Sequence, residues 1–219
     1  MKVCTDACLF GAYLANELQL VHVNNILDIG TGTGLLSLML AQKTNALIDA
    51  VEIDSAAFEQ AKENFSLSPW KGRINIFHAD ISKLEMGKKY SHIISNPPFF
   101  EDDLRSADQK KNFAKHDSSL TLENLLVVID KHLTDDGSFA VLLPFHRSGY
   151  FETAAAKLHF NLAQKIFVKQ TPKHNYFRSI SVFSKKETTT RTEDIIIKNE
   201  EGNYSVSFTS LLKDYYLYL

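Results

Sequence analysis

Cysteine is scarce in this chain, which has 219 residues and only two cysteines, Cys4 and Cys8. No second pair completes a zinc site, so we expect no bound metal. Long apolar stretches are missing too, and no run reaches the roughly 18 residues that a membrane helix needs. Residues 1–6 contain no apolar region of the secretory kind. These absences predict a cytoplasmic protein that does not enter a membrane.

An excess of positive charge is also missing. The chain has 24 lysines and arginines against 26 aspartates and glutamates, a net charge of −2. A protein that depends on non-specific phosphate contacts is usually more basic, so any nucleic-acid role must rest on a local patch. Two stretches can supply one, although each can also be a solvated face. Their basic residues are Lys110, Lys111, Lys115 and His116 in the first, and Lys165, Lys169, Lys173, His174 and Arg178 in the second.

What is present is an alternation of short apolar runs and longer helical patterns. The runs at residues 26–30, 47–53, 73–78, 90–95 and 139–143 predict strands. Helical spacing marks residues 35–41, 55–65 and 122–133, and we expect the last helix to close at residues 135–137. Strands separated by helices of this length form a parallel sheet with helices on both faces.

The pattern changes after residue 150. A helix at 154–158 precedes strands at 160–168 and 179–183, whose connection is too short for a helical crossover, so this pair should be antiparallel. We therefore predict the α/β class, with a doubly wound, mostly parallel seven-stranded sheet that ends in an antiparallel hairpin. This arrangement resembles the Rossmann-like class I methyltransferases. Residues 1–187 would form that domain, and residues 188–219 a small extension packed on it, with a hairpin of strands at 195–198 and 204–208 and an aromatic tail.

A glycine-rich loop, Asp28-Ile29-Gly30-Thr31-Gly32-Thr33-Gly34, joins the first strand to the first helix of the sheet. Glycines there let the backbone pass close to a ligand at the carboxyl edge of an open sheet. In the dinucleotide fingerprint G-x-G-x-x-G, the third glycine would come one residue later. The compressed form D-x-G-x-G-x-G resembles motif I of S-adenosylmethionine-dependent methyltransferases. The resemblance implies that Asp28, Gly30, Thr31, Gly32 and Gly34 lie beside the amino-acid part of that cofactor.

Two further acids stand at the ends of neighbouring strands. Glu52 lies 22 residues beyond Gly30, where a carboxylate can accept both hydroxyl hydrogen bonds of a ribose. Asp54 is better placed to begin the next helix, so we choose Glu52 for this role. Asp80 follows the third strand, and by resemblance to the methyltransferases it accepts from the adenine amine of the cofactor. Each acid alone can be a helix cap, but three at successive strand ends favour a cofactor site.

The fourth strand ends in the quartet Asn96-Pro97-Pro98-Phe99. A strand-terminating turn is the plain alternative, because proline breaks ladder pairing. The quartet resembles the N-P-P-[F/Y/W] motif of methyltransferases that modify planar exocyclic or amide nitrogens. In that role the Asn96 side-chain oxygen and the Pro97 carbonyl accept the two N–H groups of the amine, and the prolines hold both acceptors in place. Phe99 would stack on the target base, and Asn96 would also border the cofactor.

The quartet alone leaves three targets open: adenine in nucleic acid, guanine in ribosomal RNA, or a glutamine amide in a release factor. The two ends of the chain resemble a particular family, the bacterial tRNA1(Val) adenine-37 N6-methyltransferases. The matching segments are M-K-V-C-T-D-A-C-L-F-G-A at the start, Lys115-His116 with Leu120-Thr121-Leu122, and Tyr204, Phe208, Leu211 and Asp214-Tyr215-Tyr216-Leu217 at the end. Members of that family usually carry further residues before the Met-Lys-Val segment, so we expect a truncated sequence or a misplaced start.

This resemblance implies an enzyme that uses S-adenosyl-L-methionine to methylate the N6 amine of an adenosine in a tRNA anticodon loop. Thr5 and Asp6 would lie near the amino-acid end of the cofactor, and either can also be a helix N-cap. The predicted RNA contacts are Arg105, Lys110, Lys111, Lys115, Lys173 and Arg178. A protein-glutamine N5-methyltransferase, a ribosomal guanine-N2 methyltransferase and a non-catalytic RNA-binding protein of the same fold remain alternatives. We expect a monomer.

Overall fold

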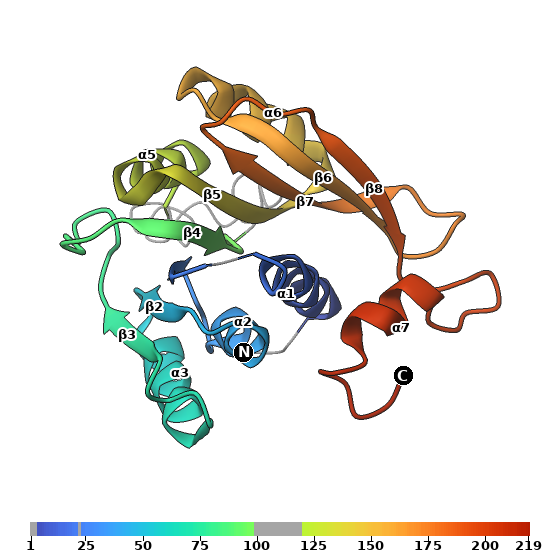
Figure 1. The fold of residues 1–219 in the computed structure, drawn as a ribbon. Helices are drawn as coiled ribbons and strands as arrows, with labels where there is room; N and C mark the ends of the chain where they lie inside the picture. The colour runs from blue at the N-terminus through green and yellow to red at the C-terminus, as the bar shows by residue number, and fades with distance from the viewer. Residues whose placement is uncertain (1–3, 22, 99–119) are drawn as a thin grey trace, which may run out of the picture.

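The computed structural model describes residues 4–21, 23–98 and 120–219. Within these residues an eight-stranded mixed sheet runs through the centre of the molecule (Figure 1), in the order β3-β2-β1-β4-β5-β7-β6-β8. The strands are β1 (Asn25–Ile29), β2 (Leu47–Glu52), β3 (Ile74–His78), β4 (Tyr90–Ser95), β5 (Leu133–Pro144), β6 (Asn161–Lys169), β7 (Tyr176–Ser184) and β8 (Arg191–Ile196). The helices are α1 (Thr5–Leu18), α2 (Leu35–Lys43), α3 (Ser55–Leu67), α5 (Leu122–His132), α6 (Phe145–Lys157) and α7 (Val206–Leu212).

Strands β3, β2, β1, β4 and β5 are parallel. β7 then pairs antiparallel with both β5 and β6. The predicted α/β class and the predicted antiparallel pair are therefore confirmed. The chain winds outward in one direction from β1 to β3 and in the other from β4 onward. Ligands of open α/β sheets bind at such a reversal, outside the carboxyl ends of the strands.

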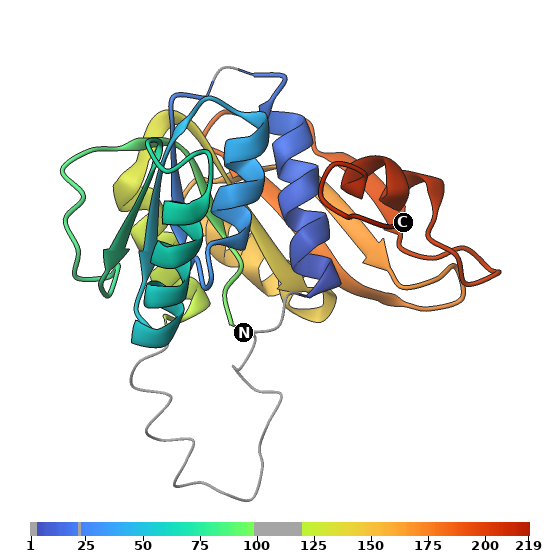
Figure 2. The ribbon, with the colours of Figure 1, turned by 90° about the horizontal axis from the view of Figure 1, so that it is seen from below.

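Side chains of the central strands point alternately to two apolar cores. Ile26, Ile48 and Ile94 pack with α1, α2 and α3 on one face. Figure 2 shows these three helices side by side on that face. Leu27 and Ile93 pack with α5 and α6 on the other face. Because both faces are covered, these strands are apolar almost throughout, as their short uninterrupted apolar runs predicted.

The terminal hairpin predicted for the C-terminal extension is wrong. Its first strand extends into β8, which joins the main sheet parallel to β6, so the sheet has eight strands and not the predicted seven. Its second strand is instead the helix α7, and one antiparallel bridge, Lys198 to Tyr204, is what remains of the hairpin among the described residues. The Ser205 side chain caps α7 by accepting from the Phe208 backbone N–H at 3.1 Å. Phe208 and Leu212, four residues apart, are both fully buried, which is a helical spacing rather than a strand spacing.

The end predicted for the helix at residues 122–133 also needs correction. The helix α5 ends at His132, and residues 135–137 lie inside β5 rather than closing the helix. The register of β5 against β4 shifts in this region, so the strand contains a bulge. Gly137 fits because a Cβ there would lie 2.8 Å from the Leu133 Cδ1 atom. The Asp-Asp-Gly sequence marks a bulge as well as it marks a helix end.

The aromatic tail packs against α2. Lys43 pairs with Asp214 at 2.6 Å, and the Gln42 side chain donates to the Asp214 carbonyl. The Tyr215 hydroxyl donates to the carbonyl of Met39 at 3.2 Å. The division of the chain after residue 187 stays a prediction. In the part of the chain that the structure describes, no helix is long and apolar enough to cross a membrane.

The glycine loop is fixed against α3 by a close contact at Gly34. This residue precedes α2 with φ of +86°, and a Cβ there would lie 2.4 Å from the Cε1 atom of Phe65 on α3. Phe65 is buried and cannot withdraw without leaving the core. Glycine at this position therefore satisfies both a left-handed backbone and a steric limit.

Gly34→Ala is expected to destabilise the protein more than Gly202→Ala. Gly202 has the same φ of +86° but nothing within 4 Å of its Cβ position. The control should cost about 1 kcal/mol for the left-handed backbone, and Gly34→Ala roughly 1–3 kcal/mol more for overpacking Phe65. Urea unfolding of both variants measures the difference. Equal destabilisation by the two substitutions would mean that the Phe65 side chain moves aside without a cost in stability.

Candidate active site

The predicted site residues of the first four strands gather at the carboxyl edge of the sheet. The glycine loop follows β1, and Glu52 is the last residue of β2. Asp80 follows β3 by two residues, and Asn96 follows β4 directly. β1 pairs with both β2 and β4, so the loop and the Asn-Pro-Pro turn lie beside each other at the reversal of the sheet. The Ser95 hydroxyl ties the two strand ends together by donating to the Ile29 carbonyl at 3.0 Å.

Three left-handed glycines shape the loop. Gly30, Gly32 and Gly34 have φ of +71°, +60° and +86°. The backbone N–H groups of Gly30 and Thr31 both donate to the carbonyl of Val51 on β2, at 2.9 and 3.1 Å. The loop thus turns back over the neighbouring strand. A Cβ at Gly30 would meet nothing within 4 Å, so open space lies beside the backbone at this point.

Asp28 supports the loop from beneath. Its carboxylate is fully buried, and its Oδ2 accepts from the hydroxyls of Thr31 at 2.6 Å and Ser37 at 2.7 Å. Its Oδ1 is buried without a hydrogen-bond partner among the described residues. Burial raises the pKa of Asp28 to about 6, against the lowering effect of the two hydroxyls. Ser37 was not predicted, because a serine on an otherwise apolar helix gives no signal of its partner.

Glu52 fixes the same loop from the side. Its Oε2 accepts from the Gly32 N–H at 2.7 Å, and its Oε1 accepts from the N–H groups of Ile53 and Asp54 at 2.9 Å each. A carboxylate has about four lone-pair sites, so one remains open here. Ile53 follows Glu52 with half of its side chain exposed, which places an apolar surface next to the acid. Asp54 caps α3 by accepting from the Ala57 N–H, as expected for the start of that helix.

Asp80 is less buried than the other two acids. Its Oδ1 accepts from the backbone and hydroxyl of Ser82, at 3.0 and 2.7 Å, and Lys83 lies 3.2 Å from its Oδ2. The hydrogen bond from Ser82 is the main cause that lowers the pKa of Asp80. The residue therefore stabilises its own turn while its second oxygen faces an exposed surface cation. Asp80 has the predicted position at the sheet edge, but a turn follows it at residues 81–83, so the helix-cap alternative is wrong for this acid.

Asp6 and Arg178 were predicted to touch different ligands, but the structure pairs them with each other. The Arg178 Nε lies 2.8 Å from the Asp6 Oδ2, and both side chains are largely buried. Arg178 stands opposite Pro144 in the pairing of β7 with β5, so the ion pair places the start of α1 at the carboxyl edge. Thr5, the first residue of α1, is exposed beside it, whereas Lys173 lies in the exposed β6–β7 loop.

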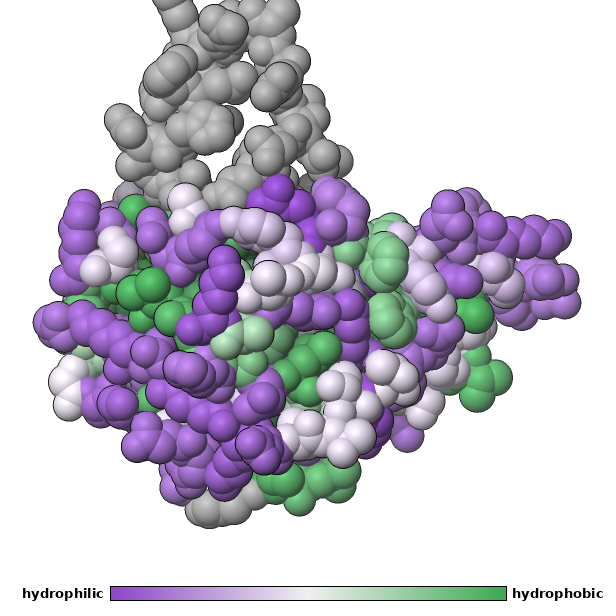
Figure 3. Space-filling view, turned by 90° about the horizontal axis from the view of Figure 1, so that it is seen from above, coloured by the Kyte–Doolittle hydropathy of each residue, from purple (hydrophilic) through white to green (hydrophobic). Residues whose placement is uncertain are grey.

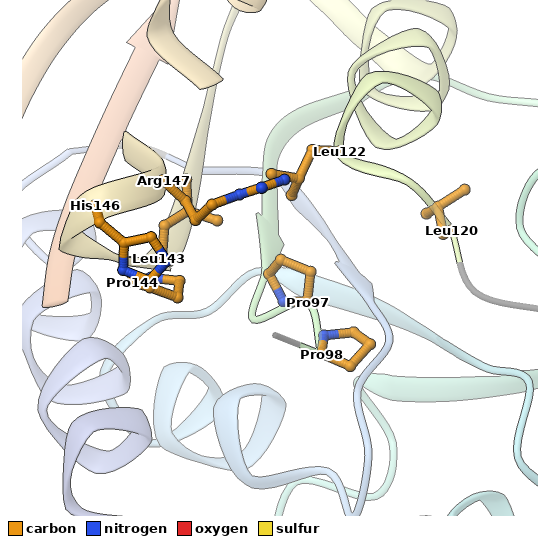
Figure 4. Close-up of a pocket in the computed structure, with 8 residues that line it drawn as sticks. All are labelled: Pro97, Pro98, Leu120, Leu122, Leu143, Pro144, His146 and Arg147. Carbon is orange, nitrogen blue, oxygen red and sulfur yellow. The ribbon is translucent and has the colours of Figure 1, made fainter. Parts of the chain in front are cut away.

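The Asn-Pro-Pro turn opens onto a shallow hollow at the surface (Figure 4). The Asn96 Oδ1 is buried and has no hydrogen-bond partner among the described residues. Pro97 is buried and Pro98 is exposed at the wall of the hollow. The lining residues are Pro97, Pro98, Leu120, Leu122, Leu143, Pro144, His146 and Arg147.

Several lining residues were missed by the sequence analysis. His146 and Arg147 begin α6, and the Arg147 side chain extends across the hollow toward Leu122 (Figure 4). The signal available was their position after the fifth parallel strand, at the same edge as the quartet. The predicted residues Phe99, Arg105, Lys110, Lys111 and Lys115 lie outside the described residues. Within the described ranges, no group of three or more histidines, cysteines or acids could hold a metal ion.

The strand order, the glycine loop after β1 and the Asn-Pro-Pro turn after β4 define a class I methyltransferase. The family model "Methyltransferase small domain" matches residues 10–143. A structure from Agrobacterium tumefaciens described as a predicted O-methyltransferase has a TM-score of 0.72 at 15% identity, covering 94% of this chain and 95% of that one. The glycopeptide N-methyltransferase MtfA complexed with S-adenosyl-L-methionine has a TM-score of 0.59 at 10% identity, covering 82% and 94%.

Relatives of nearly full length narrow the class further. The tRNA1(Val) (adenine(37)-N6)-methyltransferase of Dyadobacter fermentans is 41% identical, covering 99% of this chain and 91% of the relative. Those of Pectobacterium carotovorum and Bacteroides thetaiotaomicron are 39% and 38% identical, covering all of this chain and 88% and 92% of the relatives. The chain belongs to the tRNA1(Val) (adenine(37)-N6)-methyltransferase family, which confirms the resemblance seen at its two ends. The cofactor of this family is S-adenosyl-L-methionine.

Asp28→Asn should change how stability depends on pH. The pKa of Asp28 is raised from 3.8 to about 6 on folding, so the folded chain holds this proton more tightly than the unfolded chain. Unfolding releases the proton, and the wild type therefore loses stability as pH rises from about 4 to about 6. The shift corresponds to up to about 3 kcal/mol. The free energy of unfolding of Asp28→Asn, relative to that of wild type, should therefore rise by up to this amount between pH 4 and pH 7.

Urea unfolding at both pH values measures this gain. Other buried groups titrate in both proteins, so the difference between them isolates Asp28. The exposed Asp136, changed to Asn, is the matched control for the loss of one surface carboxylate. A difference between Asp28→Asn and wild type that does not change with pH would contradict the assignment.

Proposed function

We propose that this chain transfers the methyl group of S-adenosyl-L-methionine to the exocyclic N6 of adenosine 37 in tRNA1(Val). Membership of the family supports this reaction. The residues gathered at the carboxyl edge of the sheet support that edge as the active site. The cytoplasmic location and the monomeric state stay predictions.

The buried, unpaired Oδ1 of Asn96 is the observation that carries this proposal. Such an acceptor costs roughly 1–3 kcal/mol when it lacks a donor, so its persistence calls for a ligand with an N–H group. The lone pair of an aromatic amine is delocalised into the ring, which makes the amine a weak nucleophile. An acceptor fixed beside it favours the positive charge that develops as the nitrogen is methylated. Asn96 need not be a strong base, because the proton leaves after the amine has become a cation.

Pro97 and Pro98 make this acceptor rigid. Proline restricts its own φ and the conformation of the residue before it, so Asn96 and the Pro97 carbonyl are held in a narrow range of positions. The hollow beside them has apolar walls from Leu122, Leu143 and Pro144. A planar purine fits such walls, because its faces are apolar and its edge carries the polar groups.

The cofactor residues fit a nucleoside that carries an amino-acid tail. Glu52 offers one open lone pair for one of the two ribose hydroxyls, with the apolar Ile53 beside it. The open space next to Gly30 lets a ligand approach the loop backbone. Asp80 would accept from the adenine amine, and Thr5 with Asp6 would stand near the amino-acid end. When bound, the sulfonium supplies an electrophilic methyl group, and the chain contributes alignment and charge stabilisation.

Methyl transfer to unmodified tRNA tests the proposal directly. Incubation with labelled S-adenosyl-L-methionine and in-vitro-transcribed tRNA1(Val), followed by nucleoside analysis, should yield N6-methyladenosine at position 37. A transcript with guanosine at this position should remain unlabelled. Label in N2-methylguanosine, or in a release-factor glutamine when that protein is supplied, would replace the proposal with one of the other two target classes.

Asn96→Ala should abolish most of the transfer while leaving the cofactor site intact. Loss of one oriented polar group at a reacting centre typically lowers kcat by about 10²–10³. Affinity for S-adenosyl-L-methionine, measured by calorimetry, should change little because Glu52 and the glycine loop remain. Asn45→Ala, at an exposed position on the opposite edge, is the matched control. Near-normal turnover by Asn96→Ala would overturn the role given to this amide.

A further inference from the structure

Three aromatic side chains cluster beside the start of α6. The ring centroids of Phe145 and Phe167 lie 5.9 Å apart, those of Phe145 and Tyr176 5.2 Å, and those of Phe167 and Tyr176 5.0 Å. All three are only partly buried. Two lysines lie over this cluster: the Nζ of Lys165 is 5.3 Å from the Phe167 centroid, and the Nζ of Lys169 is 4.5 Å from that of Tyr176. We call these five residues the aromatic platform.

The aromatic platform adjoins the hollow at the Asn-Pro-Pro turn. β6 runs parallel to β5, because both pair antiparallel with β7, so the end of β6 reaches the same edge of the sheet as Pro144. Phe145 belongs to the platform, and the next two residues, His146 and Arg147, line the hollow. The two features therefore form one continuous surface on the side where α6 lies. Figure 3 shows this side, where apolar and hydrophilic side chains are mixed.

Positive charge exceeds negative charge around the platform. Among the described residues two acids lie beside it: Glu152 pairs with Lys165 at 2.5 Å, and Asp194 accepts from the Tyr176 hydroxyl at 2.8 Å. Besides Lys165, whose charge Glu152 balances, the cations among the described residues are Arg147, Lys169 and Lys173, the last in the exposed loop that follows β6. Because the whole chain carries a net charge of −2, this local excess is not a consequence of composition.

We propose that the aromatic platform binds the unpaired nucleotides next to the target base of the tRNA. Bases of a single-stranded segment stack on aromatic rings without regard to sequence, and a lysine beside the rings, here Lys169, contacts a phosphate. The Tyr176–Asp194 hydrogen bond fixes the ring before any ligand arrives, which reduces the entropy lost on binding. An acidic protein partner could pair its carboxylates with the lysines, but unlike RNA it has no bases to stack on the aromatic rings. This inference rests on the proposed function, because it assigns a surface to the same substrate.

Two pairs of variants in the full chain test the platform. Lys169→Glu reverses a charge on it, and Lys62→Glu is the matched control, because Lys62 also lies over an aromatic ring, that of Phe58 on α3. Tyr176→Leu removes a ring, while Tyr176→Phe keeps the ring and loses only the hydrogen bond to Asp194. The probe for binding is a fluorescein-labelled, unmodified anticodon stem–loop of tRNA1(Val), followed by anisotropy at several salt concentrations. Methyl transfer to the whole tRNA gives KM and kcat.

Lys169→Glu should weaken RNA binding about tenfold or more. It should also make log Kd less dependent on log salt, by about 0.7 for each phosphate that the variant no longer neutralises. Tyr176→Leu should weaken binding at least about fivefold, and Tyr176→Phe by much less. For both weakened variants KM for tRNA should rise, with kcat and S-adenosyl-L-methionine affinity near those of wild type. Lys62→Glu should resemble wild type throughout.

The outcomes separate this inference from the proposed function. If wild type methylates tRNA and Lys169→Glu behaves like Lys62→Glu, the platform is overturned and the function stands. If wild type binds the stem–loop but methylates nothing, the proposed function fails. The platform can still be judged in that case: weakened binding by the variants supports it, and unchanged binding overturns it. No binding of the stem–loop by wild type, or equal displacement of it by polyglutamate, would overturn the platform.

Discussion

The hydrogen bonds between the glycine loop and the end of β2 are the constraint on which the site depends. Val51 accepts from the N–H groups of Gly30 and Thr31, and the Glu52 carboxylate accepts from the N–H of Gly32. These bonds turn the chain back toward β2 before α2 can begin. Left-handed glycines are required because no other residue adopts this path at low cost. Glu52 therefore holds the loop, and one lone pair of its carboxylate remains open for the cofactor role proposed above.

Charge is unevenly distributed along the carboxyl edge. Asp28, Glu52 and Asp80 stand at the ends of β1, β2 and β3, whereas Arg147 and Lys169 stand near the ends of β5 and β6. A cationic cofactor is favoured on the acidic side, and a polyanionic RNA is favoured on the basic side. Asn96 follows β4, between the two. The order of strands thus accounts for how one sheet edge can accept a cation and a polyanion without bringing like charges together.

The sequence predicted correctly which residues lie together at one edge of the sheet, because that depends on their position along parallel strands. In such a sheet every strand carries its next residue to the same edge, so the glycine loop, Glu52 and Asn96 could be expected to meet without knowledge of the tertiary contacts. The Asp6–Arg178 ion pair could not be predicted, because the two residues are 172 positions apart. The sequence also suggested a different partner for each, the cofactor for Asp6 and the RNA for Arg178. The strand predicted at 204–208 was wrong for a local reason. Alternate apolar residues at 204–208 suit a strand, but burial of Phe208 and Leu212 together requires a helix.

Two buried oxygens without partners among the described residues lie at this edge, Asp28 Oδ1 and Asn96 Oδ1. Each costs on the order of 1–3 kcal/mol, which is a considerable fraction of the roughly 5–15 kcal/mol by which domains are typically stable. Asp28 still stabilises the loop through its other oxygen, which accepts from Thr31 and Ser37. The prolines after Asn96 restrict its backbone, and none of the described residues donates to its amide oxygen, so the cost persists in the free chain. A ligand that brings an N–H group to Asn96 removes part of this cost when it binds, and the fold is thereby most stable when its site is filled.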